Sequence, residues 1–199
     1  MLDFNLEQTC ITQGLGPVAG VDEVGRGPLA GPVVAAAVIL DPQHLPQDAN
    51  DSKKLTAAKR DKLYDAIMAS AQVGIGQASV EEIDDINILQ ATFLAMRRAI
   101  AALPQKPGML LIDGNRAPDF GITARTIVGG DAKVLSIAAA SIIAKVTRDR
   151  LMVELAKTHP QYDWPSNAGY GTAKHLEALQ QFGVTPHHRR TFRPISEMV

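Results

Sequence analysis

The sequence predicts an α/β domain with a mixed central sheet flanked by helices and with further helices at its C-terminal end. Two observations support this fold class. Residues 18–22 and 33–40 are short apolar runs joined by a glycine-rich link, as expected for two neighbouring buried strands. Further short apolar runs then alternate with longer segments of helical periodicity, which is typical of a domain that layers helices on a sheet.

The strands are expected where apolar residues follow one another or alternate over a few positions. Residues 18–22 and 33–40 are apolar almost throughout, which is typical of buried strands. Residues 73–79 alternate in polarity, as a half-buried strand does. Residues 109–112 form a short buried run that ends at an Asp-Gly pair, and residues 123–128 form another candidate strand.

The first helices are expected where a capping residue precedes a segment of helical periodicity. Thr56 follows a proline-rich loop over residues 41–51 and can cap a helix that runs to about residue 70. Ser79 precedes two glutamates, and acidic residues in a first turn stabilise a helix. Residues 87–103 then predict a second helix.

The C-terminal part is expected to be helical. Residues 129–131 precede a long helix over residues 132–157, which is apolar nearly all round as far as Val146 and is therefore expected to be buried. An amphipathic helix over residues 172–182 ends at Gly183, which is expected to form a left-handed cap.

The composition limits the class of protein. A chain of 199 residues, 46% of them apolar, suits one domain or one domain with a small appendage. The longest apolar run, residues 33–40, is too short to span a membrane, and residues 1–16 contain no apolar signal segment. The single cysteine, Cys10, excludes an internal disulfide framework and a cysteine-based zinc site. We therefore expect a cytoplasmic protein without membrane association, and nothing in the sequence requires more than a monomer.

The first apolar run ends in two adjacent carboxylates, Asp22 and Glu23, and the loop Gly25-Arg26-Gly27 follows. Carboxylates at the end of a buried strand are costly unless a charge such as a metal ion offsets them. The glycines expose backbone N–H groups and the arginine adds a guanidinium, which together suit a phosphate. The pattern favours phosphoryl-transfer chemistry, with a tight turn and solvated acids as the simpler alternative. A dinucleotide-binding loop is disfavoured, because strand-like residues follow where that motif requires a helix.

Two further carboxylates occupy comparable places. Asp113 ends a strand, and Asp131 lies where a glycine pair meets a helix, which are the places where open α/β sheets form their sites. With Asp22 and Glu23 they could hold two divalent ions. Each also has a simpler alternative, a turn for Asp113 and an N-cap for Asp131. Successive side chains in a strand face opposite sides, so Asp22 and Glu23 can share a site only if the strand bends or ends there.

Seven sequence blocks, in order between residues 18 and 192, resemble the type 2 ribonuclease H family, ribonuclease HII. The blocks are residues 21–32 (VDEVGRGPLAGP), 51–55 (DSKKL), 113–114 (DG), 130–131 (GD), 140–146 (ASIIAKV), 169–172 (GYGT) and 187–190 (HHRR). They cover almost the whole chain, and a match in this order is far more specific than any single block.

The resemblance implies a ribonuclease H-like catalytic domain over residues 1–160 and a helical extension packed on it over residues 161–199. Members of the family hydrolyse the RNA strand of RNA–DNA hybrids and cut 5′ of ribonucleotides embedded in duplex DNA, which leaves 3′-hydroxyl and 5′-phosphate ends. Hybrids and ribonucleotide-containing duplexes are thus the expected partners, and Mg²⁺ or Mn²⁺ the expected cofactor. The positions that match the family's acidic metal ligands are Asp22, Glu23, Asp113 and Asp131.

The resemblance also implies nucleic-acid contacts. The loop Gly25-Arg26-Gly27 would meet the 2′-hydroxyl, which distinguishes RNA from DNA, and the adjacent phosphate. Tyr170 would pack on the sugar next to the ribonucleotide and sense the junction of RNA with DNA. Because the net charge is −1, basic contacts must come from local patches. The candidate phosphate contacts, each of which could instead be a solvated charge, are Lys53, Lys54, Lys145, Arg148, Lys174, Arg189 and Arg190.

One position departs from the family pattern. Many members carry a lysine immediately before the Gly-Tyr-Gly-Thr block, where this chain has Ala168, and Lys174 is the candidate to supply the missing phosphate contact. We find no clamp-binding tail after the last basic block. His187-His188 invites a metal interpretation, but adjacent histidines without a third ligand favour packing or nucleic-acid contact.

Two other functions fit part of the sequence. A non-catalytic reader of hybrids or of ribonucleotide-containing DNA would use the same surface, but it would gain nothing from acids that face phosphate. A nucleotide- or sugar-phosphate-binding enzyme could use the glycine loop, but no Walker Gly-Lys-Ser/Thr sequence is present. The sequence therefore predicts a metal-dependent endoribonuclease.

Overall fold

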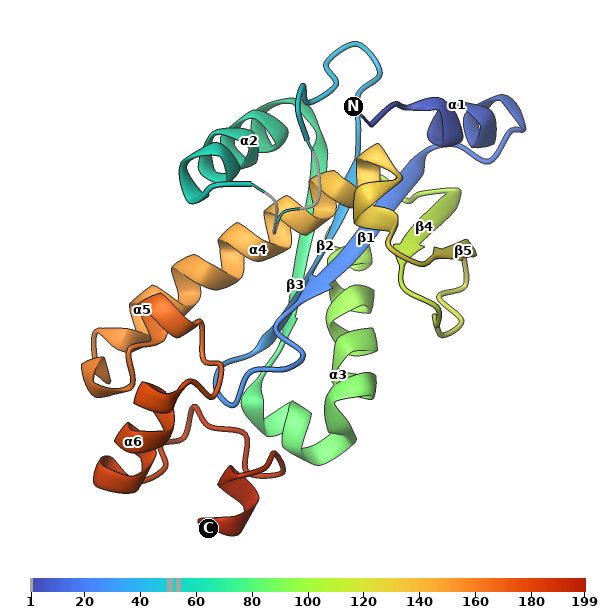
Figure 1. The fold of residues 1–199 in the computed structure, drawn as a ribbon. Helices are drawn as coiled ribbons and strands as arrows, with labels where there is room; N and C mark the ends of the chain where they lie inside the picture. Colours follow the sequence, from blue (N-terminus) through green and yellow to red (C-terminus); the bar gives the residue numbers. More distant parts are fainter. Residues whose placement is uncertain (1, 50–51, 53–54) are drawn as a thin grey trace.

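The computed structural model describes residues 2–49, 52 and 55–199 (Figure 1). The strands are β1 (Val18–Val24), β2 (Val33–Ile39), β3 (Gln72–Ala78), β4 (Met109–Asp113) and β5 (Thr123–Ile127). They form one sheet in the order β3-β2-β1-β4-β5. β1, β4 and β5 are parallel, whereas β2 is antiparallel to both β1 and β3. The predicted mixed sheet is thus confirmed.

Helices precede, separate and follow the strands. They are α1 (Asn5–Thr12), α2 (Ala57–Ser70), α3 (Val80–Ala101), α4 (Leu135–Ala156), α5 (Trp164–Asn167) and α6 (Ala173–Phe182), with 3₁₀ turns at Gly130–Ala132, Pro160–Tyr162 and Ile195–Glu197. Both predicted helix starts are capped. The side chain of Thr56 accepts a hydrogen bond from the N–H of Lys59, and Ser79 forms a reciprocal capping box with Glu82. Asn87, with a φ of 66°, interrupts α3 where a new helix was expected.

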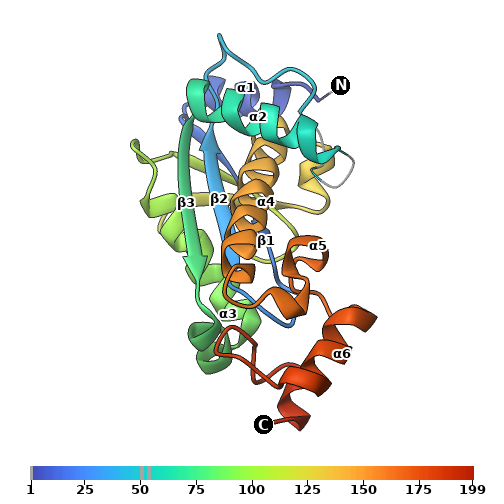
Figure 2. The same ribbon diagram turned by 90° about the vertical axis from the view of Figure 1, so that its left-hand side faces the viewer.

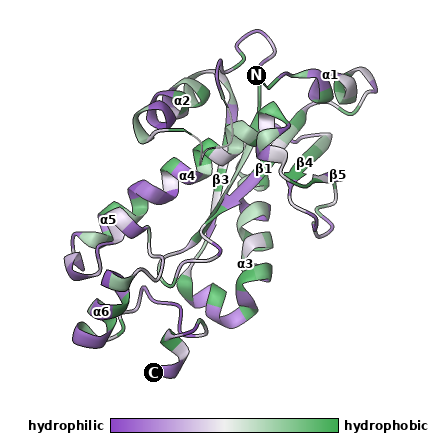
Figure 3. Cartoon of the chain, viewed as in Figure 1, coloured by the Kyte–Doolittle hydropathy of each residue, from purple (hydrophilic) through white to green (hydrophobic). Residues whose placement is uncertain are grey.

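The sheet separates two layers of helices, with α3 on one face and α4 and α2 on the other (Figures 1 and 2). The alternation of β2 explains this arrangement, because Ala35 and Ala37 pack on the α3 side whereas Ala36 and Val38 pack on the α4 side. The predicted burial of the long helix is confirmed for residues 135–144. Figure 3 shows hydrophobic residues along the central strands and the first half of α4.

α4 lies close to β1 because residue 20 is a glycine. A Cβ atom at Gly20 would lie 2.1 Å from the carbonyl carbon of Ser136, in the first turn of α4. Gly74 and Gly76 of β3 approach α3 in the same way, since a Cβ atom at either would lie within 2.3 Å of a main-chain oxygen. These small residues therefore set the spacing between the sheet and both helix layers.

Two local expectations are wrong, and two helices were not expected. The long helix begins at Leu135 rather than at residue 132, because Gly130–Ala132 forms a 3₁₀ turn, and its N-cap is Val134 rather than Asp131. Gly183 ends α6 with a φ of 78° but a ψ of −165°, so it is not a left-handed helical cap. The unexpected helices are α1 and the four-residue α5, and neither N-cap has a side-chain hydrogen bond.

The C-terminal segment packs against the loop between β1 and β2 and against the end of α4 (Figure 2). Leu29 of that loop shares an apolar cluster with Trp164 and Leu179. Its N–H donates to the carbonyl of Gly169 at 2.8 Å, and its carbonyl accepts from the N–H of Arg189 at 2.9 Å. A division of the chain near residue 160 stays a prediction. No helix in the described ranges has the length and apolarity that a membrane crossing requires.

Candidate active site

A cavity of about 410 Å³ opens where β1 meets the glycine loop. The predicted site residues that line it are Asp22, Glu23, Gly25, Arg26, Gly27, Asp113, Lys145, Arg148 and Tyr170. A larger cavity of about 690 Å³ lies at the opposite end of β1, around Pro17 and Val18, and the only carboxylate among its described lining residues is Asp41. The acidic residues that suggest chemistry therefore gather in the smaller cavity.

Asp22 and Asp113 face the same side of the sheet. β1 and β4 are parallel and Val21 pairs with Ile112, so the next residue on each strand comes side by side. Val21 and Ile112 pack in the core on the α3 side, and alternate side chains point to opposite faces. The two aspartates consequently face α4, from which Lys145 lines the same cavity.

Glu23 reaches the cavity from the other face of the sheet. β1 continues to Val24, so the strand does not end at Asp22, but β4 ends at Asp113 and leaves this edge of β1 open. Glu23 lines both the main cavity and a second cavity of about 320 Å³ on the α3 side. Its carboxylate accepts a hydrogen bond from Arg26 at 3.2 Å. The open edge therefore lets successive residues of one strand serve one site.

Asp131 is joined to this site through Asp113. It is buried in the 3₁₀ turn directly after Gly130, whose backbone N–H donates to Asp113 Oδ1 at 2.6 Å. This hydrogen bond holds the turn against the end of β4. The described lining of the cavity does not include Asp131, so its role as a fourth metal ligand stays a prediction.

The cavity carboxylates destabilise one another's charged forms. Burial raises the pKa of Asp22 well above its usual range, the charges of Glu23 and Asp113 raise it further, and a hydrogen bond with Ser141 lowers it in part. Burial also raises the pKa of Glu23, whereas Arg26 lowers it. Buried acids of like charge are costly in the absence of a cation. The electrostatics of the cavity therefore favour a bound divalent cation.

The donor chemistry fits Mg²⁺ or Mn²⁺, because all the candidate ligands are carboxylate oxygens. Within the described ranges, no three Asp, Glu, His or Cys side chains stand close enough together to form a complete protein cage for an ion. Mg²⁺ is usually bound by one or two carboxylates together with waters and substrate phosphates. The neighbouring aspartates Asp22 and Asp113 meet this requirement, so an ion completed by a substrate phosphate fits the cavity.

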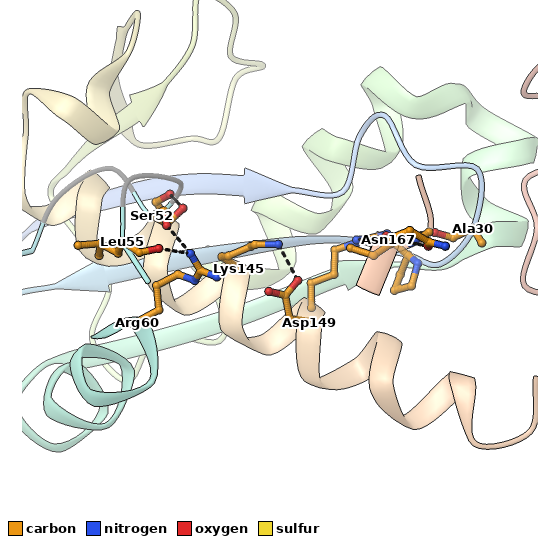
Figure 4. Close-up of polar contacts among 12 residues, drawn as sticks. Ala30, Ser52, Leu55, Arg60, Lys145, Asp149 and Asn167 are labelled. Atoms are coloured by element: carbon orange, nitrogen blue, oxygen red, sulfur yellow. Dashed lines mark hydrogen bonds and ion pairs between the residues drawn. The ribbon is translucent and has the colours of Figure 1, made fainter. Parts of the chain in front are cut away.

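Two serines that sequence reasoning did not assign support Asp22. Ser141 shares a hydrogen bond with Asp22, and its hydroxyl lies 2.8 Å from that of Ser52 in a buried pair. Arg60 of α2 holds the Ser52 segment by donating to two of its carbonyls, at 2.9 and 2.6 Å (Figure 4). The position of Ser141 one helical turn before Lys145 could have indicated its role. The pairing with Ser52 is not local, so no sequence pattern indicates it.

The predicted lysine contacts lie in different environments. Lys145 lines the cavity and pairs with Asp149 at 2.7 Å (Figure 4). Lys174 is exposed, pairs with Asp163 at 3.2 Å and is not among the described residues that line the cavity. Lys53 and the lysine after it lie outside the described residues. The contact of each lysine with nucleic acid stays a prediction.

Arg148 and Arg189 are buried and do not present free guanidinium groups to a phosphate. Both donate to backbone carbonyls around the loop between β1 and β2. Gly25 permits this arrangement: its φ is 92°, and a Cβ atom there would lie 2.2 Å from Nε of Arg148. A Cβ atom at Gly27 would lie 3.3 Å from the ring of Tyr170, so the tyrosine rests against the loop.

The histidine pair His187-His188 does not form a metal site with a third ligand among the described residues. Nε2 of His188 lies 3.0 Å from Nε2 of His175, and Nδ1 of His188 accepts from the N–H of Thr185 at 3.0 Å. Burial, followed by the charge of His175, lowers the pKa of His188 to about 4. Both nitrogens of His188 are thus used inside the protein, which agrees with packing, one of the two roles expected for the pair.

Comparison with known sequences gives one consistent family. The family profile described as Ribonuclease HII matches residues 19–195. The chain is 59% identical over 198 residues to a ribonuclease HII of Ruegeria pomeroyi, covering 99% of this chain and 85% of the relative. It is 56% identical over 198 residues to a ribonuclease HII of Paracoccus denitrificans, covering 99% of this chain and 94% of the relative.

Solved structures agree with the architecture. Ribonuclease H2 of Pyrococcus horikoshii superposes with a TM-score of 0.76 at 29% identity, covering 91% of this chain and 96% of that protein. The ribonuclease HII of Archaeoglobus fulgidus, solved in complex with PCNA, superposes with a TM-score of 0.75 at 26% identity. The match covers 88% of this chain and 95% of that protein. A ribonuclease HIII solved with Mn²⁺ gives 0.68 at 18% identity over 91% and 68% of the two chains, which shows a common fold alone.

Proposed function

The chain belongs to the ribonuclease HII family, and we propose that it hydrolyses the RNA strand of RNA–DNA hybrids and cuts 5′ of ribonucleotides embedded in duplex DNA. Because relatives of this family match 99% of the chain, it is an endonuclease of the ribonuclease H type, and thus a hydrolase. The ribonucleotide-directed cut, the divalent metal and the residue roles are the proposed part. Repair of ribonucleotides in DNA is the process that this cut would serve.

One observation carries the proposal. Asp22 and Asp113 lie side by side on parallel strands, and Glu23, the glycine loop and Tyr170 line the same cavity. A site that only bound nucleic acid would be weakened by three acids facing phosphate, because like charges repel. The grouped carboxylates therefore favour catalysis over simple binding.

Asp22, Glu23, Asp113 and Asp131 would hold the metal. Of two bound divalent ions, one would lower the pKa of an attacking water and the other would stabilise the charge on the leaving oxygen. The water oxygen would bond to phosphorus as the bond from phosphorus to the 3′-oxygen breaks. A proton from the water would pass to the 3′-oxygen, which leaves 3′-hydroxyl and 5′-phosphate ends. Ser141 would keep Asp22 in place through its hydrogen bond during this reaction.

The other cavity residues would recognise the substrate. Backbone N–H groups of residues 25–27 would meet the 2′-hydroxyl and its phosphate, since glycine lets a backbone come close. Tyr170, half exposed beside Gly27, would pack its ring on the adjoining sugar. Lys145 would neutralise a neighbouring phosphate. All of these residues come from one chain, so the proposed site needs no second copy.

The test is cleavage of a labelled DNA duplex that carries a single ribonucleotide, with Mg²⁺, with Mn²⁺ and with EDTA. An all-DNA duplex of the same sequence is the control. The expected result is a metal-dependent cut on the 5′ side of the ribonucleotide that is absent from the control. Measurable binding without a cut in either metal would favour the non-catalytic reader instead, and Ala168→Lys would be the first variant to examine.

A further inference from the structure

Two arginines lie buried against the glycine loop. Arg148 of α4 is 1% exposed and Arg189 of the C-terminal segment is 0% exposed. Neither forms an ion pair with a described residue. A buried cation without a carboxylate is costly, so it requires several strong hydrogen-bond acceptors. Here the acceptors are backbone carbonyls of the loop and of the segment beside it.

Arg189 binds the part of the loop nearest the cavity. Its guanidinium donates to the carbonyls of Gly25, Arg26 and Gly31, the last two at 2.8 Å. Its Nε also donates to Gly31 at 3.0 Å. One side chain thus fixes both ends of the loop.

Arg148 joins the same loop to the segment that carries the tyrosine. It donates to the carbonyls of Ala30 and Pro32, at 3.0 and 2.9 Å, and to that of Ala168 at 2.8 Å. Tyr170 lies two residues further on and rests against the loop. Arg148 therefore fixes the position of the loop relative to the tyrosine.

The inward carbonyls determine where the loop's N–H groups point. The peptide bonds after Gly25 and after Arg26 are trans, so each carbonyl and the N–H of the next residue point in opposite directions. Since Arg189 binds both carbonyls, the N–H groups of Arg26 and Gly27 point away from the buried guanidinium, on the side of the cavity that both residues line. Neither N–H has an acceptor among the described residues.

The buried charges act in the same direction. Burial lowers the pKa of Arg148 to about 10 and that of Arg189 to about 9, so both remain cationic at neutral pH. A positive charge in a poorly solvated place attracts an anion more strongly than a surface charge does. The pair thus favours a phosphate in front of the loop and offsets the repulsion from the carboxylates.

We propose that Arg148 and Arg189 are positioning residues for ribonucleotide selection, because they turn the loop carbonyls inward and so aim the N–H groups of Arg26 and Gly27 at the 2′-hydroxyl and phosphate of the substrate. This inference rests on the proposed function. It adds that selection depends on two side chains that act by holding the loop carbonyls. The ligand recognised is a ribonucleotide within a duplex.

The first experiment compares Arg148→Lys and Arg189→Lys with matched controls. Lysine keeps the charge but cannot bind three carbonyls at fixed angles. Arg150→Lys, on the same helix, and Arg193→Lys, in the same segment, alter exposed arginines that pair with Asp61 and Glu197. Each protein is assayed in Ca²⁺ for binding to a duplex with one ribonucleotide and to an all-DNA duplex, and its melting temperature is recorded.

We expect the preference for the ribonucleotide duplex to fall by about tenfold in each of the two buried variants, as for the loss of one well-placed hydrogen bond. Binding to the all-DNA duplex should change little. Both control variants should keep the preference of the unaltered protein. If the preference for the ribonucleotide duplex is unchanged and any loss of binding follows a lower melting temperature, the arginines are merely structural. If the unaltered protein neither prefers nor cuts the ribonucleotide duplex, the proposed function fails first.

A second measurement covers the case in which the lysine variants do not fold. Hydrogen exchange of the unaltered protein is followed at the N–H groups of Arg26 and Gly27 by NMR. The ribonucleotide duplex should slow exchange at both N–H groups. The protection that it gives should be at least about tenfold greater than the protection given by the all-DNA duplex. Equal protection by both duplexes would overturn the proposal.

Discussion

Asp113 accepts a hydrogen bond of 2.6 Å from the backbone N–H of Gly130, which lies on a separate segment of the chain. The carboxylate therefore has two tasks. It contributes negative charge to the cavity, and it holds the turn that contains Asp131 against the end of β4. The two tasks can be separated by mutation, because an amide oxygen can still accept the hydrogen bond.

Asp113→Asn should retain the fold and lose catalysis. The variant keeps an acceptor for Gly130 but lacks the charge that would bind metal. We expect cleavage to fall by at least about a hundredfold, since mutating even an indirect partner of a metal ligand can cost that much. Single-turnover cleavage measures the loss, and binding in Ca²⁺ should stay near that of the unaltered protein. Parallel losses of binding and cleavage would make Asp113 a structural residue. Asp113→Ala, which removes both tasks, should also melt at a lower temperature.

Tyr170→Ala should impair cleavage at a single ribonucleotide more than cleavage of a continuous hybrid. The ring is half exposed and rests against Gly27, so it can reach a sugar next to the loop. Loss of stacking should cost about 1–3 kcal/mol. The measurement is kcat/KM on both substrates, with Tyr170→Phe as the control that keeps the ring. Equal losses on the two substrates would show that Tyr170 does not sense a junction.

Asp22→Asn should stabilise the protein without metal and reduce its response to metal. Burial and the charges of Glu23 and Asp113 raise the pKa of Asp22, so its ionised form is costly when no cation is bound. Mg²⁺ or Mn²⁺ at about 100 times its dissociation constant should stabilise the unaltered protein by about 2.7 kcal/mol. Thermal melting at pH 7.5, with metal or EDTA, measures both effects. An identical metal response in the variant would exclude Asp22 as a ligand.

Stability should fall as the pH falls from about 6.5 to about 4. The pKa of His188 is lowered to about 4 in the folded protein, mainly by burial and then by the charge of His175, while His187 and His159 lower it further. In that pH range the unfolded chain binds a proton that the folded protein excludes, so acid favours unfolding. The loss should be on the order of 3 kcal/mol, since the pKa of His188 lies about 2.5 units below its usual value and one unit corresponds to about 1.4 kcal/mol. Urea unfolding at several pH values measures it.

The matched variants for this prediction are His188→Asn and His44→Asn. The first removes the group that resists protonation, so its stability should depend less on pH between 4 and 6.5. The second alters an exposed histidine that pairs with Asp41 and should retain the full pH dependence. A pH profile of His188→Asn that matches the unaltered protein would assign the effect to another group.

Local patterns were sufficient to predict most of the fold. The caps at Thr56 and Ser79 and the apolar runs of the strands are formed by residues close together in sequence, and each was found in the structure. α1 was missed because its N-cap, Phe4, is not a capping residue and has no side-chain hydrogen bond. The start of α4 was misplaced because Asp131 has the residue type and position of a cap, whereas the tertiary hydrogen bond between Gly130 and Asp113 holds that segment as a 3₁₀ turn.

The candidate site was predictable in its acids and not in their support. Asp22 and Asp113 were expected from strand ends, but their side-by-side placement follows from the register of β1 and β4, which no local pattern specifies. Arg148 and Arg189 were candidate phosphate contacts, with a solvated charge as the alternative, whereas both are buried. Their burial depends on carbonyl groups far away along the chain, one of them that of Gly31.

The glycine at position 20 has a consequence for experiments that score function alone. It touches no substrate in the proposed mechanism, yet any side chain there would push α4 off β1, and α4 carries Ser141, Lys145 and Arg148. A saturation screen read out by cleavage would consequently rank Gly20 beside the aspartates proposed to be catalytic. Only a parallel screen for folded protein, in which Asp113→Asn passes and substitutions at Gly20 fail, would separate the residues that perform chemistry from the one that sets the spacing between the two layers.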